Sequence, residues 1–193
     1  MSEKVGAVLV VGGGIAGIQA SLDLGDSGFR VYLLDESPSI GGTMTQLDKT
    51  FPTNDCAMCI LAPKLVTSGR HPNIHLITNA AVKKVDGEAG NFKVAITRRA
   101  RYVNMEKCTG CGVCAEKCPV EAIDEFNQGL DERGGIFVKY PQAVPLTYMV
   151  DKEKCIGCGT CREVCKAGAV EYDQKEEDVT LSVGSIILAP GFE

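Results

Sequence analysis

The chain has 193 residues, with 20 Lys and Arg against 25 Asp and Glu, and a formal net charge of −5. This acidic balance disfavours nucleic acid as a partner, and the absence of an apolar run of roughly 20 residues predicts no membrane span. Ten cysteines with no recognisable secretory signal indicate the reducing cytoplasm, not a disulfide-stabilised secreted domain.

A glycine-rich turn follows the first predicted strand. Residues 5–11 are expected to form a buried strand that leads into GGGIAG, and an apolar helical face follows at Ile15, Ile18 and Leu22. This is the G-x-G-x-x-G pattern of dinucleotide-binding sites, in which glycines let backbone N–H groups approach a pyrophosphate at a helix N-terminus. The candidate cofactor-binding residues of the turn are Gly12, Gly14, Ile15, Ala16 and Gly17.

An acidic residue ends the second predicted strand. The run RVYLL leads to Asp35, eighteen residues past Gly17, where a carboxylate accepts hydrogen bonds from the ribose hydroxyls of a dinucleotide. The following SPSIGGT resembles the glycine pair that flavoproteins with two dinucleotide domains place near the flavin, which favours FAD over NAD. The candidates here are Asp35, Glu36, Gly41, Gly42 and Thr43.

A cysteine pair, Cys56 and Cys59, lies in a segment with little clear periodicity. Three interpretations stay open. The pair is a redox-active dithiol that faces the flavin, or it supplies two ligands of a third iron–sulfur cluster completed outside this chain, or it consists of buried thiols beside Ile60 and Leu61.

Strand-like runs follow in IHLIT, AVKKV and NFKVAITRR, separated by turn signals. Near the end of the chain, VTLSVGSIILAPGFE contains two more strand-like runs. Its turn is similar to the segment that resumes the nucleotide-binding sheet in flavoproteins, so Ala189 and Gly191 are further cofactor-binding candidates.

A cysteine motif, Cys-x2-Cys-x2-Cys-x3-Cys, occurs twice, 47 residues apart. Zinc sites have no place for the third, closely spaced cysteine, whereas in two-cluster ferredoxins the fourth cysteine of each motif ligates the other cluster. The repeat therefore predicts two 4Fe-4S clusters, and Ala122-Ile123 and Ala169-Val170 supply matching apolar residues. The ligands of cluster 1 are Cys108, Cys111, Cys114 and Cys165, and those of cluster 2 are Cys155, Cys158, Cys161 and Cys118.

The expected fold class is α/β, with a Rossmann-like FAD-binding domain and an inserted α+β ferredoxin of the bacterial two-cluster type. Residues 1–102 and 175–193 are assigned to the FAD-binding domain, and residues 103–174 to the insertion. Insertion is tolerated where an exposed turn has its two ends close together. Between the motifs, GGIFVKY is a predicted strand without an evident pairing partner.

The runs GGGIAG, SPSIGGTM, TQLDKTFPTNDCAMCILAPKL and HPNI, together with the inserted double motif, closely resemble the A-type subunits of heterodisulfide reductases. The resemblance implies a thioredoxin-reductase-like FAD protein that acts in flavin-based electron bifurcation. FAD would take an electron pair from a hydrogenase or formate dehydrogenase. One electron would pass to ferredoxin and the other to B- and C-type subunits, which reduce the disulfide substrate.

The resemblance also implies a hetero-oligomer of anaerobic methanogenesis. Family members are much longer than 193 residues, so the chain is expected to be a fragment or one piece of a split subunit that does not enclose the whole flavin. The alternative function is an electron-relay or docking adaptor whose flavin site is completed by a partner chain.

Overall fold

The computed structural model of the chain describes residues 5–191. These residues form two compact units: unit 1 runs to Arg99 and resumes at Glu176, and unit 2 comprises Ala100–Lys175. Residues 100–102 and Lys175, assigned to the flavin-binding domain from the sequence, belong to unit 2 by their contacts.

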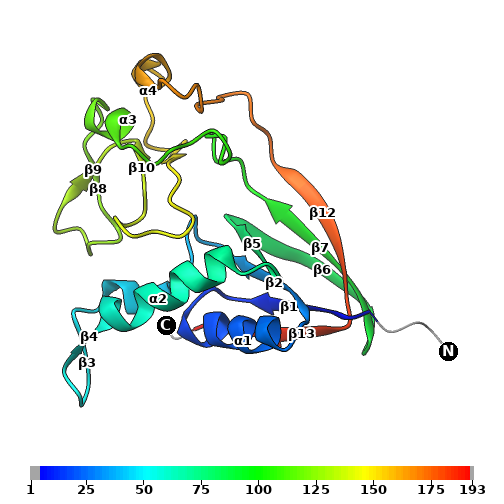
Figure 1. Ribbon diagram of the computed structural model, residues 1–193. Coiled ribbons are helices and arrows are strands. Elements are labelled where there is room, and N and C mark those ends of the chain that lie inside the picture. The colour runs from blue at the N-terminus through cyan, green and yellow to red at the C-terminus, as the bar shows by residue number, and fades with distance from the viewer. Residues whose placement is uncertain (1–4, 192–193) are drawn as a thin grey trace. The chain divides into compact units, whose positions relative to one another are not determined.

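Unit 1 is built on a parallel sheet of four strands in the order β13-β1-β2-β5 (Figure 1). Helix α1 connects β1 to β2, and helix α2 precedes β5. The predicted α/β fold class is thus confirmed. The elements are β1 (Ala7–Val11), α1 (Ile15–Asp26), β2 (Arg30–Asp35), α2 (Ala57–Arg70), β5 (Ile74–Thr78) and β13 (Ser185–Leu188).

A second sheet of unit 1 is antiparallel and contains β6 (Ala80–Glu88), β7 (Asn91–Arg98) and β12 (Glu177–Val183), in the order β12-β7-β6. Three of the predicted strand-like runs are confirmed as these strands, and the other two, IHLIT and the last run, are confirmed as β5 and β13 of the parallel sheet. Arg98 at the end of β7 pairs with Glu177 at the start of β12. The chain therefore leaves the antiparallel sheet before unit 2, and returns to it after unit 2, at two residues that pair directly with each other.

The core of unit 1 lies on both faces of the parallel sheet. On one face Leu9 and Leu34 pack against the antiparallel sheet, in a cluster that includes Val94, Ile96 and Val183. The alternate residues of β1 and β2 are buried as well, as expected for a sheet covered on both sides. Helix α1 covers this second face with Ile18 and Leu22, and α2 packs against α1. Ile15, predicted to share that buried face, is 38% exposed at the start of α1.

The segment between β2 and β5 contains structure that the sequence did not reveal. A short 3-10 helix, η1 (Gly42–Gln46), is followed by a hairpin of β3 (Lys49–Thr50) and β4 (Asp55–Cys56), which leads directly into α2. The buried residues of α2 are Ala57, Leu61, Leu65 and Ser68. Their spacing is helical, although Pro63 inside the helix obscures it.

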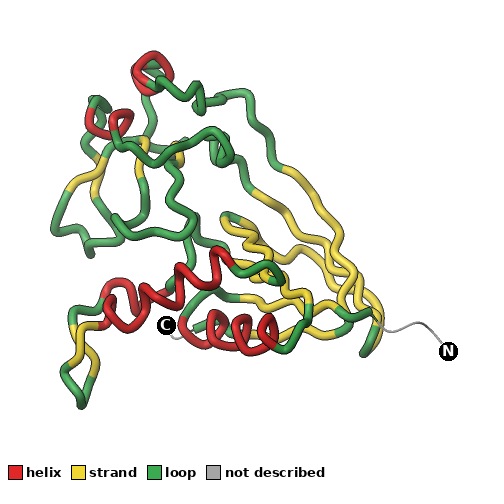
Figure 2. Tube along the Cα trace, viewed as in Figure 1, coloured by secondary structure: helices red, strands yellow, loops and turns green. Residues whose placement is uncertain are grey.

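Unit 2 is mostly loops, with two short helices and four two-residue strands (Figure 2). Its cysteine motifs fold alike, because Gly110 and Gly112 in the first motif have the left-handed φ values of 69° and 85°, and Gly157 and Gly159 in the second have 72° and 83°. Only glycine adopts such angles without strain. The elements are α3 (Val113–Glu116), β8 (Ala122–Ile123), β9 (Glu132–Arg133), β10 (Ile136–Phe137), β11 (Met149–Val150) and α4 (Thr160–Val164).

The link between the two motifs makes the halves of unit 2 unequal. The predicted strand of GGIFVKY is β10, and its partner is β11, just before the second motif. Arg133 in the link donates to Asp151 at 2.8 Å, in a largely buried ion pair. Ile123 was expected to match Val170 in the core, but β8 pairs with β9 of the link and Ile123 is 65% exposed.

Candidate functional site

The glycine turn after β1 is closely packed from within the protein. Gly12 has a φ of +106°, and a Cβ there would overlap the carbonyl oxygen of Ala189. Ala189 donates to the Val11 carbonyl at 2.7 Å, which continues the pairing of β13 with β1 into the turn. A Cβ on Gly17 would overlap the Gly12 carbonyl oxygen. Gly12 and Gly17 are therefore needed for the shape of the turn itself.

Gly14 has a different environment. It is the N-cap of α1, and a Cβ built on it would meet no protein atom within 4 Å. Ile15 and Ala16, the next two residues, are exposed or largely so. The N-terminus of α1 therefore faces open space, with the first-turn N–H groups and the positive end of the helix dipole directed toward it. This geometry fits the pyrophosphate of a dinucleotide.

Asp35 links the glycine turn to the end of β2. One carboxylate oxygen accepts from the Gly13 N–H at 2.6 Å, and the other accepts from the Ser37 N–H at 2.7 Å. The carboxylate thus fixes the glycine turn and the loop after β2 to the end of β2. Gly41 donates to the Gly13 carbonyl at 2.7 Å, and a Cβ on Gly42 would lie 2.9 Å from Gly14 Cα.

Two segments that are distant in the sequence, the loop after β2 and Ala189, thus contact the glycine turn. The remaining candidates Glu36, Thr43 and Gly191 are exposed, and Gly191 has a φ of +89°. No bond among described residues ties those three to the turn.

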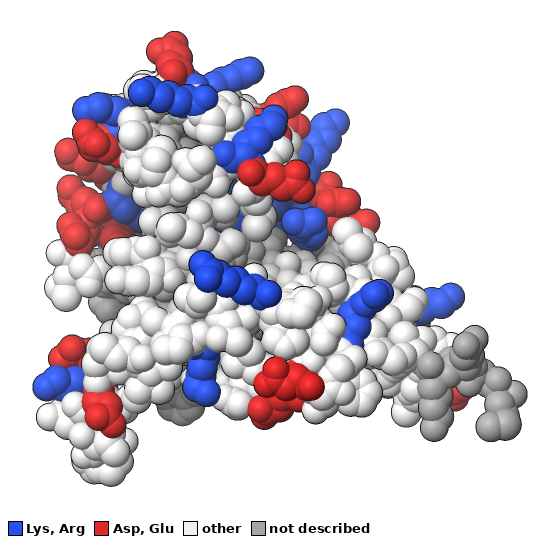
Figure 3. Space-filling model, viewed as in Figure 1, with Lys and Arg blue, Asp and Glu red and all other residues white. Residues whose placement is uncertain are grey.

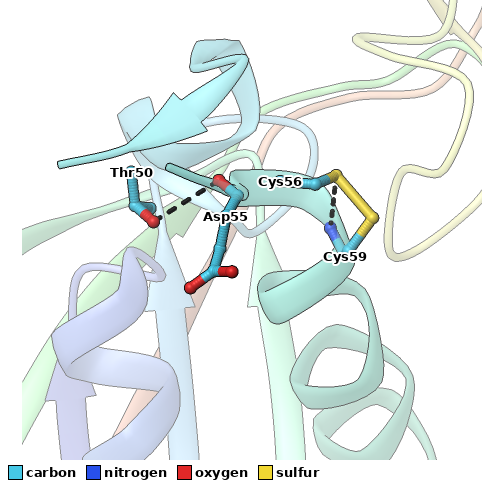
Figure 4. Close-up of a disulfide and its surroundings, with 4 residues drawn as sticks. All are labelled: Thr50, Asp55, Cys56 and Cys59. Atoms are coloured by element: carbon cyan, nitrogen blue, oxygen red, sulfur yellow. Dashed lines mark hydrogen bonds between the residues drawn. A yellow bond between two sulfur atoms is a disulfide. The ribbon is translucent and has the colours of Figure 1, made fainter. Parts of the chain in front are cut away.

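Cys56 and Cys59 form a disulfide at the start of α2 (Figure 4). Their Cα atoms lie 5.2 Å apart, and the Cys59 N–H donates to the Cys56 sulfur at 3.1 Å, so Cys56 caps the helix. The hairpin before it is held by Thr50, whose hydroxyl donates to the Asp55 carbonyl at 3.4 Å. Both cysteines are exposed, so the interpretation as buried thiols is wrong.

The eight cysteines of the double motif divide between two cavities of unit 2. Each cavity contains three cysteines from one motif and the fourth cysteine from the other motif. This is the crossed arrangement predicted for the two clusters. The first cavity is lined by Cys108, Cys111, Cys114 and Cys165, and the second by Cys118, Cys155, Cys158 and Cys161.

The cavities differ in size and cover. The first has a volume of about 400 Å³ and is bordered by Tyr148 from the link. The second is narrow, at about 10 Å³, and is bordered by Tyr172. Four cysteines line each cavity, which is the ligand number of a 4Fe-4S cluster.

Hydrogen bonds and burial give the cysteines of each motif different acidities. The N–H of Val113 and the hydroxyl of Thr109 lower the pKa of the Cys111 thiol, and Thr160 does the same for Cys158 through its hydroxyl and N–H. Burial raises the pKa of the Cys114 thiol to about 11 and also raises that of Cys161. The pKa of the second cysteine of each motif is therefore lower than that of the third.

Within residues 5–191, no three His, Cys, Asp or Glu side chains converge on a single-ion site. Cys56 and Cys59 therefore have no third ligand within the described residues. On the visible face of unit 2, in the upper part of Figure 3, basic and acidic side chains are interspersed.

Comparison with known proteins assigns a family model to each unit. Residues 7–106 match FAD dependent oxidoreductases, and residues 101–124 and 148–171 match the 4Fe-4S binding domain. A solved structure that matches part of the chain is L-proline dehydrogenase from P. horikoshii, which is 26% identical, with a TM-score of 0.42, and is covered over 19% of its length by 48% of this chain.

Curated relatives match nearly the whole chain. The first of two A-type iron-sulfur subunits of CoB--CoM heterodisulfide reductase from Methanopyrus kandleri is 59% identical over 99% of this chain. The A-type subunit of the H(2)/formate:CoB-CoM heterodisulfide,ferredoxin reductase from Methanococcus maripaludis is 59% identical over 96% of it. The chain spans 29% and 28% of the length of these two proteins, respectively.

Proposed function

The chain belongs to the FAD dependent oxidoreductase family, and from this premise we propose that it carries electrons between FAD and two 4Fe-4S clusters as part of a heterodisulfide-reductase-like complex. Within the family it matches a segment of the A-type heterodisulfide reductase subunits. Its cofactor classes are those of its two family models, FAD and 4Fe-4S.

The observation that carries the proposal is the division of eight cysteines between two cavities, four to each, with the fourth cysteine crossing over. Such crossing places two clusters in one small core, where Val103, Ile136 and Val170 lie among the ligands. One-electron carriers held in a shared core form a short path for electrons. Unit 2 therefore supports a relay function.

The glycine turn supports the flavin half of the proposal. Gly14 would let the pyrophosphate approach the start of α1, Gly12 and Gly17 would keep the shape of the turn, and Asp35 would accept from the ribose while it ties the turn to β2. FAD supplies the step that clusters cannot perform, because it exchanges electrons both in pairs and singly. Gly41, Gly42 and Ala189 would shape the turn around it.

The partners follow from the relatives. The Methanococcus maripaludis protein is described as acting with H2 or formate, the CoB-CoM heterodisulfide and ferredoxin. By analogy, we expect a hydrogenase or formate dehydrogenase as donor, ferredoxin as one acceptor, and B- and C-type subunits that carry the disulfide site, in a cytoplasmic hetero-oligomer. Two acceptors for one donor are the requirement of electron bifurcation. The helices of residues 5–191 are all too short or too polar to cross a membrane.

An inventory of iron and flavin tests this function. The native protein, purified without oxygen, is expected to contain about eight irons from the double motif and FAD in equal amount to the chain. Elemental analysis and the flavin absorption spectrum measure both. Zinc in place of iron would exclude the relay, and iron without FAD would favour the docking adaptor.

The Cys56–Cys59 pair is proposed to be a redox-active dithiol. Both cysteines are exposed residues at the N-terminus of a 14-residue helix, where the helix dipole stabilises a thiolate. The disulfide would take up two electrons and two protons to give two thiols, and a reduced flavin would be the chemical class of its two-electron donor. The alternative, two ligands of a third cluster, needs further ligands from outside the described chain.

Replacing both cysteines with serine separates these roles. The dithiol predicts that the Cys56→Ser, Cys59→Ser protein takes up two electrons fewer in an anaerobic reductive titration, with its iron content unchanged. A third cluster predicts instead the loss of about four irons. If neither the electron count nor the iron content changes in the assembled complex, the pair has no redox role.

A further inference from the structure

A tyrosine hydroxyl reaches a cysteine sulfur in one half of unit 2 alone. Tyr172 Oη lies 2.9 Å from Sγ of Cys161, the third cysteine of the second motif. Tyr172 is seven residues past Cys165, and the same position after the first motif is Glu125, which is exposed. The contact is therefore a departure from the repeat and is not explained by it.

The direction of this hydrogen bond follows from the chemistry of the ligand. A cysteine that binds iron does so as a thiolate, which has no proton to donate. Tyr172 must then be the donor and the Cys161 sulfur the acceptor. The bond lies beside the second cavity, among Val120, Ile136 and Val150, where apolar surroundings strengthen it.

The backbone holds Tyr172 firmly in place. Val170 pairs with Val103, and the Glu171 N–H donates to the Tyr102 carbonyl at 2.9 Å. Beyond Tyr172, the Gln174 side chain accepts from the backbone N–H groups of Arg101 and Tyr102, at 2.9 and 2.6 Å. Bonds on both sides of Tyr172 thus fix the segment that carries the hydroxyl.

Other donors to the cysteines are shared between the halves. Thr109 in the first motif and Thr160 in the second each bond the second cysteine of their own motif. Backbone N–H groups donate to Cys165 in the first cavity and to Cys118 and Cys155 in the second. Hydrogen bonds from threonine hydroxyls and from backbone N–H groups therefore occur in both cavities. Among the hydrogen bonds to the eight cysteines, the one from a tyrosine hydroxyl distinguishes the second cavity.

Tyr148 is the matched residue of the first cavity. It lines that cavity, and its hydroxyl lies 3.1 Å from the position that a Cβ on Gly112 would occupy. Among the described residues, its hydroxyl bonds none of the eight cysteines. Tyr148 packs over the first motif but does not bond a ligand.

We propose that Tyr172 is a positioning residue that makes the cluster of the second cavity the more readily reduced of the two. This inference rests on the proposed function. Reduction adds one negative charge, part of which lies on the ligand sulfurs, and a hydrogen bond to sulfur stabilises that charge. An electron that enters unit 2 therefore comes to rest in the cluster of Cys155, Cys158, Cys161 and Cys118.

The test is a redox titration of the intact, fully loaded protein, followed by electron paramagnetic resonance. Tyr172→Phe keeps the ring and removes the donor. The higher of the two midpoint potentials, that of the cluster in the second cavity, is expected to fall by about 59 mV. This is roughly a tenfold change in a one-electron reduction equilibrium. The lower midpoint potential should stay unchanged. Tyr148→Phe is the matched control and should leave both potentials unchanged.

A second variant covers the case in which Tyr172→Phe fails to hold its cluster. Site-specific 3-fluorotyrosine at position 172 is a stronger donor of nearly the same size, so the same midpoint should rise. If a variant at position 172 contains about eight irons and both of its midpoint potentials equal those of the wild type, Tyr172 does not have the proposed role. The proposed relay function would not be affected by that result. A protein that contains no iron–sulfur cluster would instead overturn the proposed function.

Discussion

Removing Cys108 together with Cys118 is expected to abolish both clusters, whereas removing Cys108 together with Cys165 should abolish one. The reason is the crossed lining of the cavities: Cys108 and Cys165 line the first, but Cys118 lines the second. Each pair combines the first cysteine of the first motif with the fourth cysteine of one motif or the other. The number of substitutions is therefore the same, and only their distribution between cavities differs.

Iron and sulfide analysis of the two double-alanine proteins, prepared without oxygen, measures the outcome. Of about eight irons, the Cys108→Ala, Cys165→Ala protein should keep about four and the Cys108→Ala, Cys118→Ala protein close to none. A three-iron cluster that forms after the loss of one ligand is recognised by its electron paramagnetic resonance signal. Its irons are counted for the cavity from which that ligand was removed. If each motif instead bound its own cluster without crossing, the two results would be exchanged.

Gly14→Ala is expected to weaken FAD binding without destabilising the protein, and Gly17→Ala is expected to destabilise it. A Cβ at Gly14 meets no protein atom within 4 Å, so the free energy of unfolding should change by no more than about 1 kcal/mol. The same methyl group occupies the space in which a pyrophosphate would approach the backbone. We expect FAD affinity to fall at least about tenfold, or 1.4 kcal/mol.

At Gly17, by contrast, a Cβ would overlap the Gly12 carbonyl oxygen and lie 3.3 Å from Val10 Cγ1. Overpacking of this kind costs about 3 kcal/mol, so Gly17→Ala should lose stability even in the absence of flavin. Thermal unfolding of the flavin-free proteins and fluorescence titration with FAD separate the two effects. Wild-type FAD affinity in Gly14→Ala would show that this turn does not hold the cofactor.

The regular part of unit 1 could be predicted from the sequence because its signals are local. The strands have continuous apolar runs, and the glycine turn has its motif between a strand and a helix. The burial of Ile15 was mispredicted, since helical periodicity does not show that the first turn of α1 faces open space. Helix α2 was missed because Pro63 and the preceding hairpin conceal a spacing that Leu61 and Leu65 do carry.

The features that distinguish the two cavities could not be predicted from the sequence, because they depend on contacts between distant residues. The repeat made the halves of unit 2 look equivalent. In the structure, however, β8 pairs with β9 in the link between the motifs, and β10 pairs with β11, which directly precedes the second motif. Ile123 is exposed for this reason. A tyrosine seven residues after a cysteine has no recognised pattern, so Tyr172 was found only through its distance to Cys161.

The pairing of β7 with β12 and of β1 with β13 also sets the order of assembly during synthesis. Both β12 and β13 follow residue 175, so the ribosome makes every cysteine of unit 2 before either sheet of unit 1 has all its strands. Pairing over such long sequence separations is slow. All eight cysteines of unit 2 are thus synthesised while each sheet of unit 1 still lacks one strand.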